Sequence, residues 1–75
     1  MNEKLLEVLS EVFGLTKEKI NIDMTKDDID NWDSLKQMDL VTSIEKSYSV
    51  ELDIQDIIKM KSVKDIINVI ESKIN

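Results

Sequence analysis

The chain has 75 residues, no cysteine, no histidine and a net charge of −6 at pH 7. These absences exclude disulfides, a thiol nucleophile, and the side chain that most often serves as general base and zinc ligand. The acidic balance argues against nucleic acid as a partner, and no apolar run is long enough to span a membrane.

The segment 3–13 places apolar residues at helical spacing, with charged residues on the opposite side. This pattern predicts an amphipathic helix that buries one face. The apolar positions are Leu5, Leu6, Leu9, Val12 and Phe13. Gly14, the only glycine of the chain, follows directly and predicts the C-cap of this helix, because glycine adopts positive φ without strain.

Residues 15–33 show no sustained period, so we expect an ordered connector between two helices. Its apolar residues, which we expect to hold it to the core, are Leu15, Ile20, Ile22 and Ile29. Its acidic residues, opposed only by Lys26 in the second half, are Asp23, Asp27, Asp28, Asp30 and Asp33. Such crowding suits a divalent cation, but the spacing does not match an EF-hand, and a solvated acidic loop is the favoured interpretation.

A second helix is expected to begin at about Ser34. Apolar residues then recur at helical steps, at Leu35, Met38, Leu40, Val41, Ile44 and Tyr48. Ser34 and Gln37 match the S-x-x-Q capping box, in which each side chain satisfies the backbone amide of the other residue. The motif therefore predicts Ser34 as the start of this helix, with the Gln37 side chain folded back over it.

Two further helices are predicted beyond this one. The segment 53–60 predicts one or two turns, and the segment 62–75 predicts a longer helix with Ser62 as its N-cap and Asp65 three residues on. No strand-like alternation competes with these helices. We expect an all-α fold, a small bundle of three main helices plus one short helix, as a single domain over 1–75. Charged residues interrupt any signal-peptide core at the N-terminus, so a cytoplasmic location is expected.

Ser34 is the residue of greatest chemical interest. It cannot act as a conventional nucleophile, because the chain contains no histidine to serve as its base. A serine in the first turn of a helix presents its hydroxyl beside unsatisfied backbone amides, which favour a phosphate. A modification site is therefore preferred over an enzyme. The alternative is a serine that only starts a helix, in a small acidic helical protein-interaction module without a prosthetic group.

The tripeptide DSL, at 33–35 in the middle of a short acidic helical chain, resembles the attachment motif of the acyl carrier protein family. The resemblance extends over nearly the whole chain: a first helix ending near Gly14, a long acidic loop, the E-x-x-Y stretch 45–48, and a closing S-V-x-D-I-I helix. DSL alone is a weak match. At the head of a predicted helix in an acidic bundle of this length, it is a strong one.

This resemblance implies that Ser34 is esterified by 4′-phosphopantetheine, which a phosphopantetheinyl transferase takes from coenzyme A with the help of magnesium. The thiol of that arm holds acyl intermediates as thioesters for acyl-loading and acyl-processing enzymes of lipid, polyketide or other acyl-transfer pathways. The protein is then a carrier and a monomer, not an enzyme. Asp33 is implied as a contact for the transferase or for its magnesium ion.

Candidate partner contacts surround the serine: Trp32, Leu35, Met38, Asp39 and Glu45. For Trp32, packing against the loop is the favoured interpretation and a contact for the arm or a partner is the alternative. For Met38, core packing and surface contact both stay open.

Two departures from the family bear on cargo and partners. The second helix carries Lys36 and Lys46 against Asp39 and Glu45, so its charges cancel, whereas carriers of fatty acid synthesis are strongly acidic there. A dedicated partner enzyme is therefore favoured. No Gly-Gly precedes the serine, so an acyl cargo is preferred to a peptidyl one. The resemblance also implies that Ile58 and Met60 line a cleft for the acyl chain.

Overall fold

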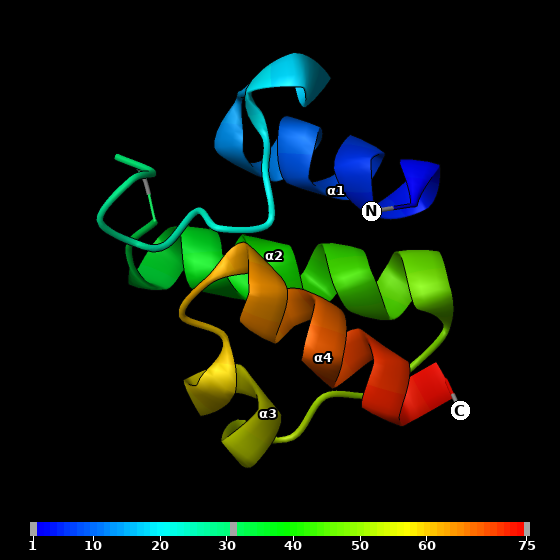
Figure 1. Ribbon diagram of the computed structural model, residues 1–75. Helices are drawn as coiled ribbons and strands as arrows, with labels where there is room; N and C mark the ends of the chain where they lie inside the picture. The colour runs from blue at the N-terminus through cyan, green and yellow to red at the C-terminus, as the bar shows by residue number, and fades with distance from the viewer. Residues whose placement is uncertain (1, 31, 75) are drawn as a thin grey trace.

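The computed structural model describes residues 2–30 and 32–74, which form four α-helices joined by loops (Figure 1). These are α1 (Glu3–Phe13), α2 (Ser34–Tyr48), α3 (Ile54–Lys59) and α4 (Val63–Ile74), with a short 3-10 helix, η1 (Lys17–Lys19), after α1. Figure 1 shows α2 between α1 on one side and the pair α3 and α4 on the other. The predicted all-α bundle of three main helices and one short helix is confirmed.

Helix α1 begins and ends at the residues that the sequence predicts. The Asn2 side chain accepts a hydrogen bond from the Leu5 N–H at 2.8 Å, which satisfies one of the free amides of the first turn. Gly14 adopts φ 67° and donates its N–H to the Ser10 carbonyl at 2.9 Å. This left-handed C-cap releases the chain into the loop.

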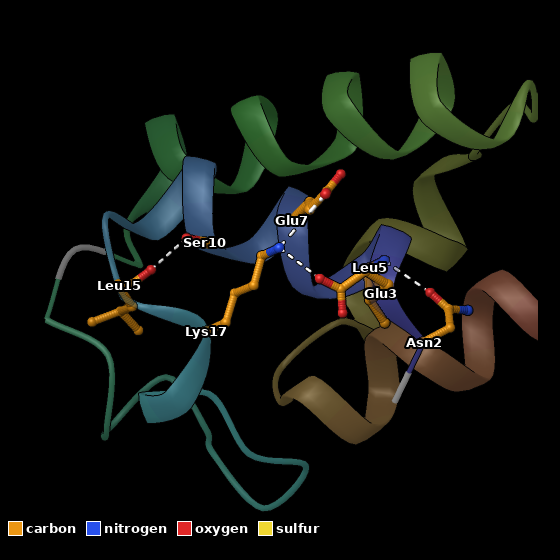
Figure 2. A network of polar contacts seen from close by, with 7 residues as sticks. All are labelled: Asn2, Glu3, Leu5, Glu7, Ser10, Leu15 and Lys17. Atoms are coloured by element: carbon orange, nitrogen blue, oxygen red, sulfur yellow. Dashed lines mark hydrogen bonds and ion pairs between the residues drawn. The ribbon is translucent and has the colours of Figure 1, made fainter.

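The segment after α1 folds back onto it (Figure 2). The Lys17 ammonium lies 2.6 Å from a Glu3 carboxylate oxygen and 3.5 Å from one of Glu7. The Ser10 hydroxyl donates to the carbonyl of Leu15 at 2.5 Å. The hydrogen bond to Glu3 is the main reason that the pKa of Lys17 is raised above its ordinary value. All the charged partners are exposed, so these contacts orient the start of the loop more than they stabilise the fold.

The long loop is ordered by the core, as expected, at Ile20 and Ile29, which are both buried. Leu15 is half-buried. The expectation for Ile22 is wrong, because its side chain is largely exposed. Ile22 lies at the corner of a turn that the Met24 N–H closes by donating to the Asn21 carbonyl at 3.2 Å, and a residue at such a corner projects away from the core.

The core consists of apolar side chains from α1, α2 and α4, from the loop between α1 and α2, and from the short connection between α3 and α4. The buried residues are Leu5, Val8, Leu9, Val12, Phe13, Ile20, Ile29, Trp32, Leu40, Val41, Ile44, Met60, Val63, Ile66, Val69 and Ile70. Helix α2 contributes Leu40, Val41 and Ile44, whereas Leu35 and Met38 lie outside. The reason is geometric: three-residue steps fall about 60° short of a full turn, so a residue nine positions later faces the opposite side.

The start of α2 differs from the predicted capping box. Asp33 is the N-cap, and its Oδ1 accepts the Lys36 N–H at 2.9 Å, so Ser34 is the first helical residue. Aspartate caps as well as serine does, and here it stands one position earlier. The Ser62 hydroxyl, by contrast, accepts the Asp65 N–H at 3.1 Å, which confirms the predicted cap of α4.

The side chain of Gln37 is turned inward instead of capping the helix. Its carbonyl oxygen accepts a hydrogen bond from the indole N–H of Trp32, and its amide donates to the Ile57 carbonyl at 2.8 Å. The same amide lies 3.4 Å from the carbonyl of Met60. One buried amide therefore joins the end of the acidic loop, α2 and α3, and it satisfies polar groups that burial would otherwise leave without partners.

Helix α3 is attached to α4 by an ion pair. The Lys73 ammonium lies 2.8 Å from an Asp56 carboxylate oxygen. Asp53 and Asp56 also form a capping box, because each backbone N–H donates to the other side chain. The hydrogen bond from Lys73, followed by that from the Asp53 backbone, lowers the pKa of Asp56, and Asp56 raises that of Lys73.

We predict that Asp56→Asn lowers the melting temperature at pH 7 and makes it less dependent on pH in acid. The folded pKa of Asp56 lies below its ordinary value of 3.8. Its stabilisation is therefore complete above that pH and is lost as the pH falls through the lower, folded value. Thermal unfolding from pH 7 to about pH 3, followed by circular dichroism, measures the effect. Glu51→Gln, at an exposed carboxylate, is the control, and equal pH profiles for the two variants would contradict the prediction.

We also predict that Gln37→Leu destabilises the fold, because the Trp32 N–H and the Ile57 carbonyl lose their partner. Each buried group left unsatisfied costs about 1–3 kcal/mol in the free energy of unfolding. In a domain of this size, each kcal/mol lowers the melting temperature by about 4–8 °C. The matched control is Gln55→Leu on the exposed face of α3. Equal melting temperatures for the two variants would show that the amide is dispensable.

Candidate functional site

Ser34 is exposed at the first position of α2. Within the described residues its hydroxyl has no hydrogen-bond partner, and the N–H groups of Ser34 and Leu35 have no acceptor. The next N–H, that of Lys36, is taken by the Asp33 carboxylate. Among the described residues, a hydroxyl without a partner thus stands beside two amides without an acceptor at the positive end of a helix dipole, an environment that accommodates a phosphate ester.

An open surface hollow surrounds this hydroxyl, and we call it the serine hollow. It is lined by Lys26, Trp32, Asp33, Ser34, Gln37 and Met38. Both sides of the hollow come from segments that the fold fixes: the acidic loop and the first turn of α2. The structure brings together four predicted site residues here: Trp32, Asp33, Ser34 and Met38.

Trp32 belongs to the core. Only 6% of the residue is exposed, and its ring centroid lies 5.0 Å from that of Phe13 at an angle of 49°. Its N–H is held by Gln37. The structure therefore places most of the ring inside the fold, which supports the packing interpretation. Trp32 also lines the serine hollow, and its contact with the arm or a partner stays a prediction.

Two apolar side chains next to Ser34 point away from the core. Leu35 is 78% exposed and Met38 is 54% exposed, and Asp39 beside them is also exposed. Of the two interpretations of Met38, the structure supports the surface position. Exposed apolar side chains at adjacent turns of a helix are typical of a contact surface.

Glu45 has an internal role. Its Oε2 accepts the backbone N–H of Leu52 at 2.8 Å, which holds the connector between α2 and α3. The residue is half-buried, and the carboxylate faces its own chain. The role of Glu45 as a contact for partners stays a prediction beside this hydrogen bond.

Ile58 and Met60 do not line one side of a cleft together. Met60 is fully buried between α3 and α4, whereas Ile58 is 62% exposed on the outer side of α3. The six-residue helix ends between them, so the chain turns and the side chains face different ways. The expectation that these two residues together line an acyl cleft is therefore wrong for this structure.

Within residues 2–30 and 32–74, no three carboxylates gather closely enough to hold a metal ion. Asp28 instead accepts the backbone N–H of Thr25 at 3.0 Å and its hydroxyl at 3.3 Å, which closes a turn. Among the helices of residues 2–30 and 32–74, none is long and apolar enough to cross a membrane.

Sequence reasoning missed two residues of this site. The capping-box motif predicts Gln37 at the helix cap, although its place five residues after a tryptophan and before a buried stretch is also compatible with an inward amide. Lys26 stood out only as the single cation of the acidic part of the loop. Its presence in the serine hollow depends on how the loop folds, which no local pattern encodes.

Comparison with known proteins agrees with this geometry. Residues 3–70 match the sequence profile of the family described as "Phosphopantetheine attachment site". The chain is also 27% identical over 74 residues to the acyl carrier protein of Petrotoga mobilis (strain DSM 10674 / SJ95), and the alignment covers 97% of this chain and 86% of that protein. Both matches favour a carrier over an interaction module without a prosthetic group. The chain therefore belongs to the acyl carrier protein family, whose members are not enzymes and carry 4′-phosphopantetheine covalently.

Proposed function

We propose that Ser34 carries the phosphopantetheine arm and that the protein holds acyl intermediates on it. The observation that supports this most directly is the exposed Ser34 hydroxyl, free of partners within the described residues, beside two free backbone amides. When attached, the arm supplies a thiol that binds an acyl group as a thioester. The chain itself has no thiol, because it contains no cysteine.

The residues around Ser34 hold its hydroxyl at the surface through different contacts. Asp33 caps α2 through Oδ1 and remains exposed, so the same carboxylate can contact the phosphopantetheinyl transferase or its magnesium ion. Gln37 and Trp32 fix the first turn from below. The hydroxyl is thus held at a defined place on the surface while the arm beyond it stays free to reach partner enzymes.

We propose that acyl-loading and acyl-processing enzymes dock mainly on Leu35 and Met38, with Asp39 at the edge. These side chains are exposed and adjoin the attachment site. The charges of α2 cancel, with Lys36 and Lys46 against Asp39 and Glu45, and Glu45 is engaged by the backbone. Desolvated apolar anchors then carry the affinity, and the charges at the rim tune the association rate. A dedicated loading enzyme suits this surface better than enzymes that select a strongly acidic helix.

We further propose an acyl cargo, in lipid, polyketide or other acyl-transfer metabolism, and a monomer located in the cytoplasm as the working form. A net charge of −6 on so small a domain opposes self-association. The same charge opposes binding to nucleic acid and to anionic membrane surfaces.

The attachment site is tested by modification in vitro. Incubation of the protein with coenzyme A, magnesium and a broad-specificity phosphopantetheinyl transferase is expected to add one arm, seen as a single step in intact mass. Ser34→Ala is expected to show no gain, whereas Ser47→Ala, at another exposed serine of α2, keeps it. Circular dichroism confirms that each variant is folded. An unchanged mass for the wild type, or an equal gain for Ser34→Ala, would overturn the proposal.

The docking surface is tested by comparing Met38→Ala with Asp39→Ala in binding of the holo protein to its acyl-loading enzyme. We expect Met38→Ala to weaken binding by about five- to thirtyfold, the loss that truncating an interface anchor by 1–2 kcal/mol gives. Asp39→Ala is expected to weaken it by less than about threefold. Affinity should depend weakly on salt. A steep fall with added salt, together with efficient use by general fatty acid synthase enzymes, would refute this surface.

A further inference from the structure

Lys26 is the only cation among the residues that line the serine hollow. Its ammonium lies 5.7 Å from the centroid of the Trp32 ring, a cation–π arrangement. It forms no ion pair with any carboxylate of the described residues, although five aspartates lie within four positions of it in the sequence or line the same hollow. A cation beside Ser34 is therefore held by an aromatic face and has not been neutralised.

The backbone of Lys26 is fixed by contacts to the junction of α3 and α4. Its N–H donates to the Lys61 carbonyl at 3.2 Å, and the Val63 N–H donates to the Met24 carbonyl at 2.9 Å. Between these two bonds, Thr25 and Ser62 form an isolated antiparallel bridge. The side chain of Lys26 thus starts from a defined point on the rim of the serine hollow, so less conformational entropy is lost when it binds a group there.

The charge balance of the hollow changes when Ser34 is modified. A phosphodiester adds a negative charge next to the exposed carboxylate of Asp33, and like charges at short range repel. The free amides of α2 offset part of this repulsion. An ammonium gains more from a charged phosphate oxygen than from the aromatic face of Trp32, because hydrogen bonds between ionised groups are stronger.

We propose that Lys26 is the counter-ion of the phosphodiester on Ser34, and that its ammonium leaves the face of Trp32 for the phosphate when the arm is attached. This inference rests on the proposed function of Ser34. It assigns to the acidic loop a role in holding the base of the arm.

Two other lysines near the site serve as matched controls. Lys36 lies in the first turn of α2 but lines a different hollow, which contains Glu11 and Asp39. Lys61 adjoins Lys26 on its other side and lines a hollow that does not include Ser34. Replacing each of the three lysines by glutamine removes one positive charge. A general effect of lost charge appears in all three variants, whereas loss of a counter-ion to the phosphodiester affects only the variant at Lys26.

The experiment compares apo and holo forms of the wild type, Lys26→Gln, Lys36→Gln, Lys61→Gln and the conservative Lys26→Arg, with complete modification verified by intact mass. The measured quantity is the melting temperature of each holo form minus that of its own apo form. At low salt, we expect this difference to be lower in Lys26→Gln than in the wild type by about 2 °C or more. The controls and Lys26→Arg should behave as the wild type does. High salt should remove the difference. Each apo form serves as the reference for any effect on folding itself.

Trp32, the only tryptophan, gives a second readout. Its emission should change on modification of the wild type, as the ammonium leaves the indole, and should not change in Lys26→Gln. Equal holo-minus-apo melting shifts in Lys26→Gln and the two control variants, or an equal emission change in Lys26→Gln and the wild type, would overturn the role of Lys26 while leaving Ser34 as the attachment site. No mass gain at Ser34 would overturn both proposals.

Discussion

The buried amide of Gln37 is the interaction on which the rest of the site depends. It binds the indole of Trp32 on one side and the carbonyl of Ile57 on the other, and so connects segments from three parts of the chain. Packing against Phe13 then adds α1 to the same arrangement. Because an amide satisfies one donor and one acceptor with fixed geometry, it sets the position of α2 relative to its neighbours more sharply than apolar contacts would.

At the start of α2, the side chains that hold the fold and those that are open to other molecules point in different directions. Gln37 faces inward, while Ser34, Leu35 and Met38 face outward. The inward residue orders the turn, and the outward residues are presented to other molecules. For the same reason, the apolar pattern of α2 begins at Leu35, whereas its buried apolar residues begin at Leu40. The hydrogen bonds of this turn hold the backbone at Ser34, the proposed attachment site, at a defined place on the surface.

The fold was predictable from the sequence where local chemistry decides the outcome. Helix α1 begins after Asn2 and ends at Gly14 because capping geometry depends on neighbouring residues only. Ser62 caps α4 for the same reason. Prediction failed where distant segments compete for a side chain. Gln37 matched a local capping motif, yet the indole and the α3 carbonyl bind it instead. The exposure of Ser34 followed from the helix start, but the approach of Lys26 depends on a bridge between residues far apart in sequence.

The short length of α3 has a consequence for motion. Six residues cannot form a stable helix alone, because nucleation costs more than so few hydrogen bonds return. This helix keeps its place through the Gln37 amide at its end, the Asp56–Lys73 ion pair and the half-buried Ile57, while Ile54 and Ile58 face solvent. We therefore expect α3 to have the lowest local stability of the four α-helices, and its amides to exchange with solvent before theirs. Because α1 packs on α2 and α3 packs on α4, we expect opening of α3 to uncover the buried Met60 while the contact between α1 and α2 is kept.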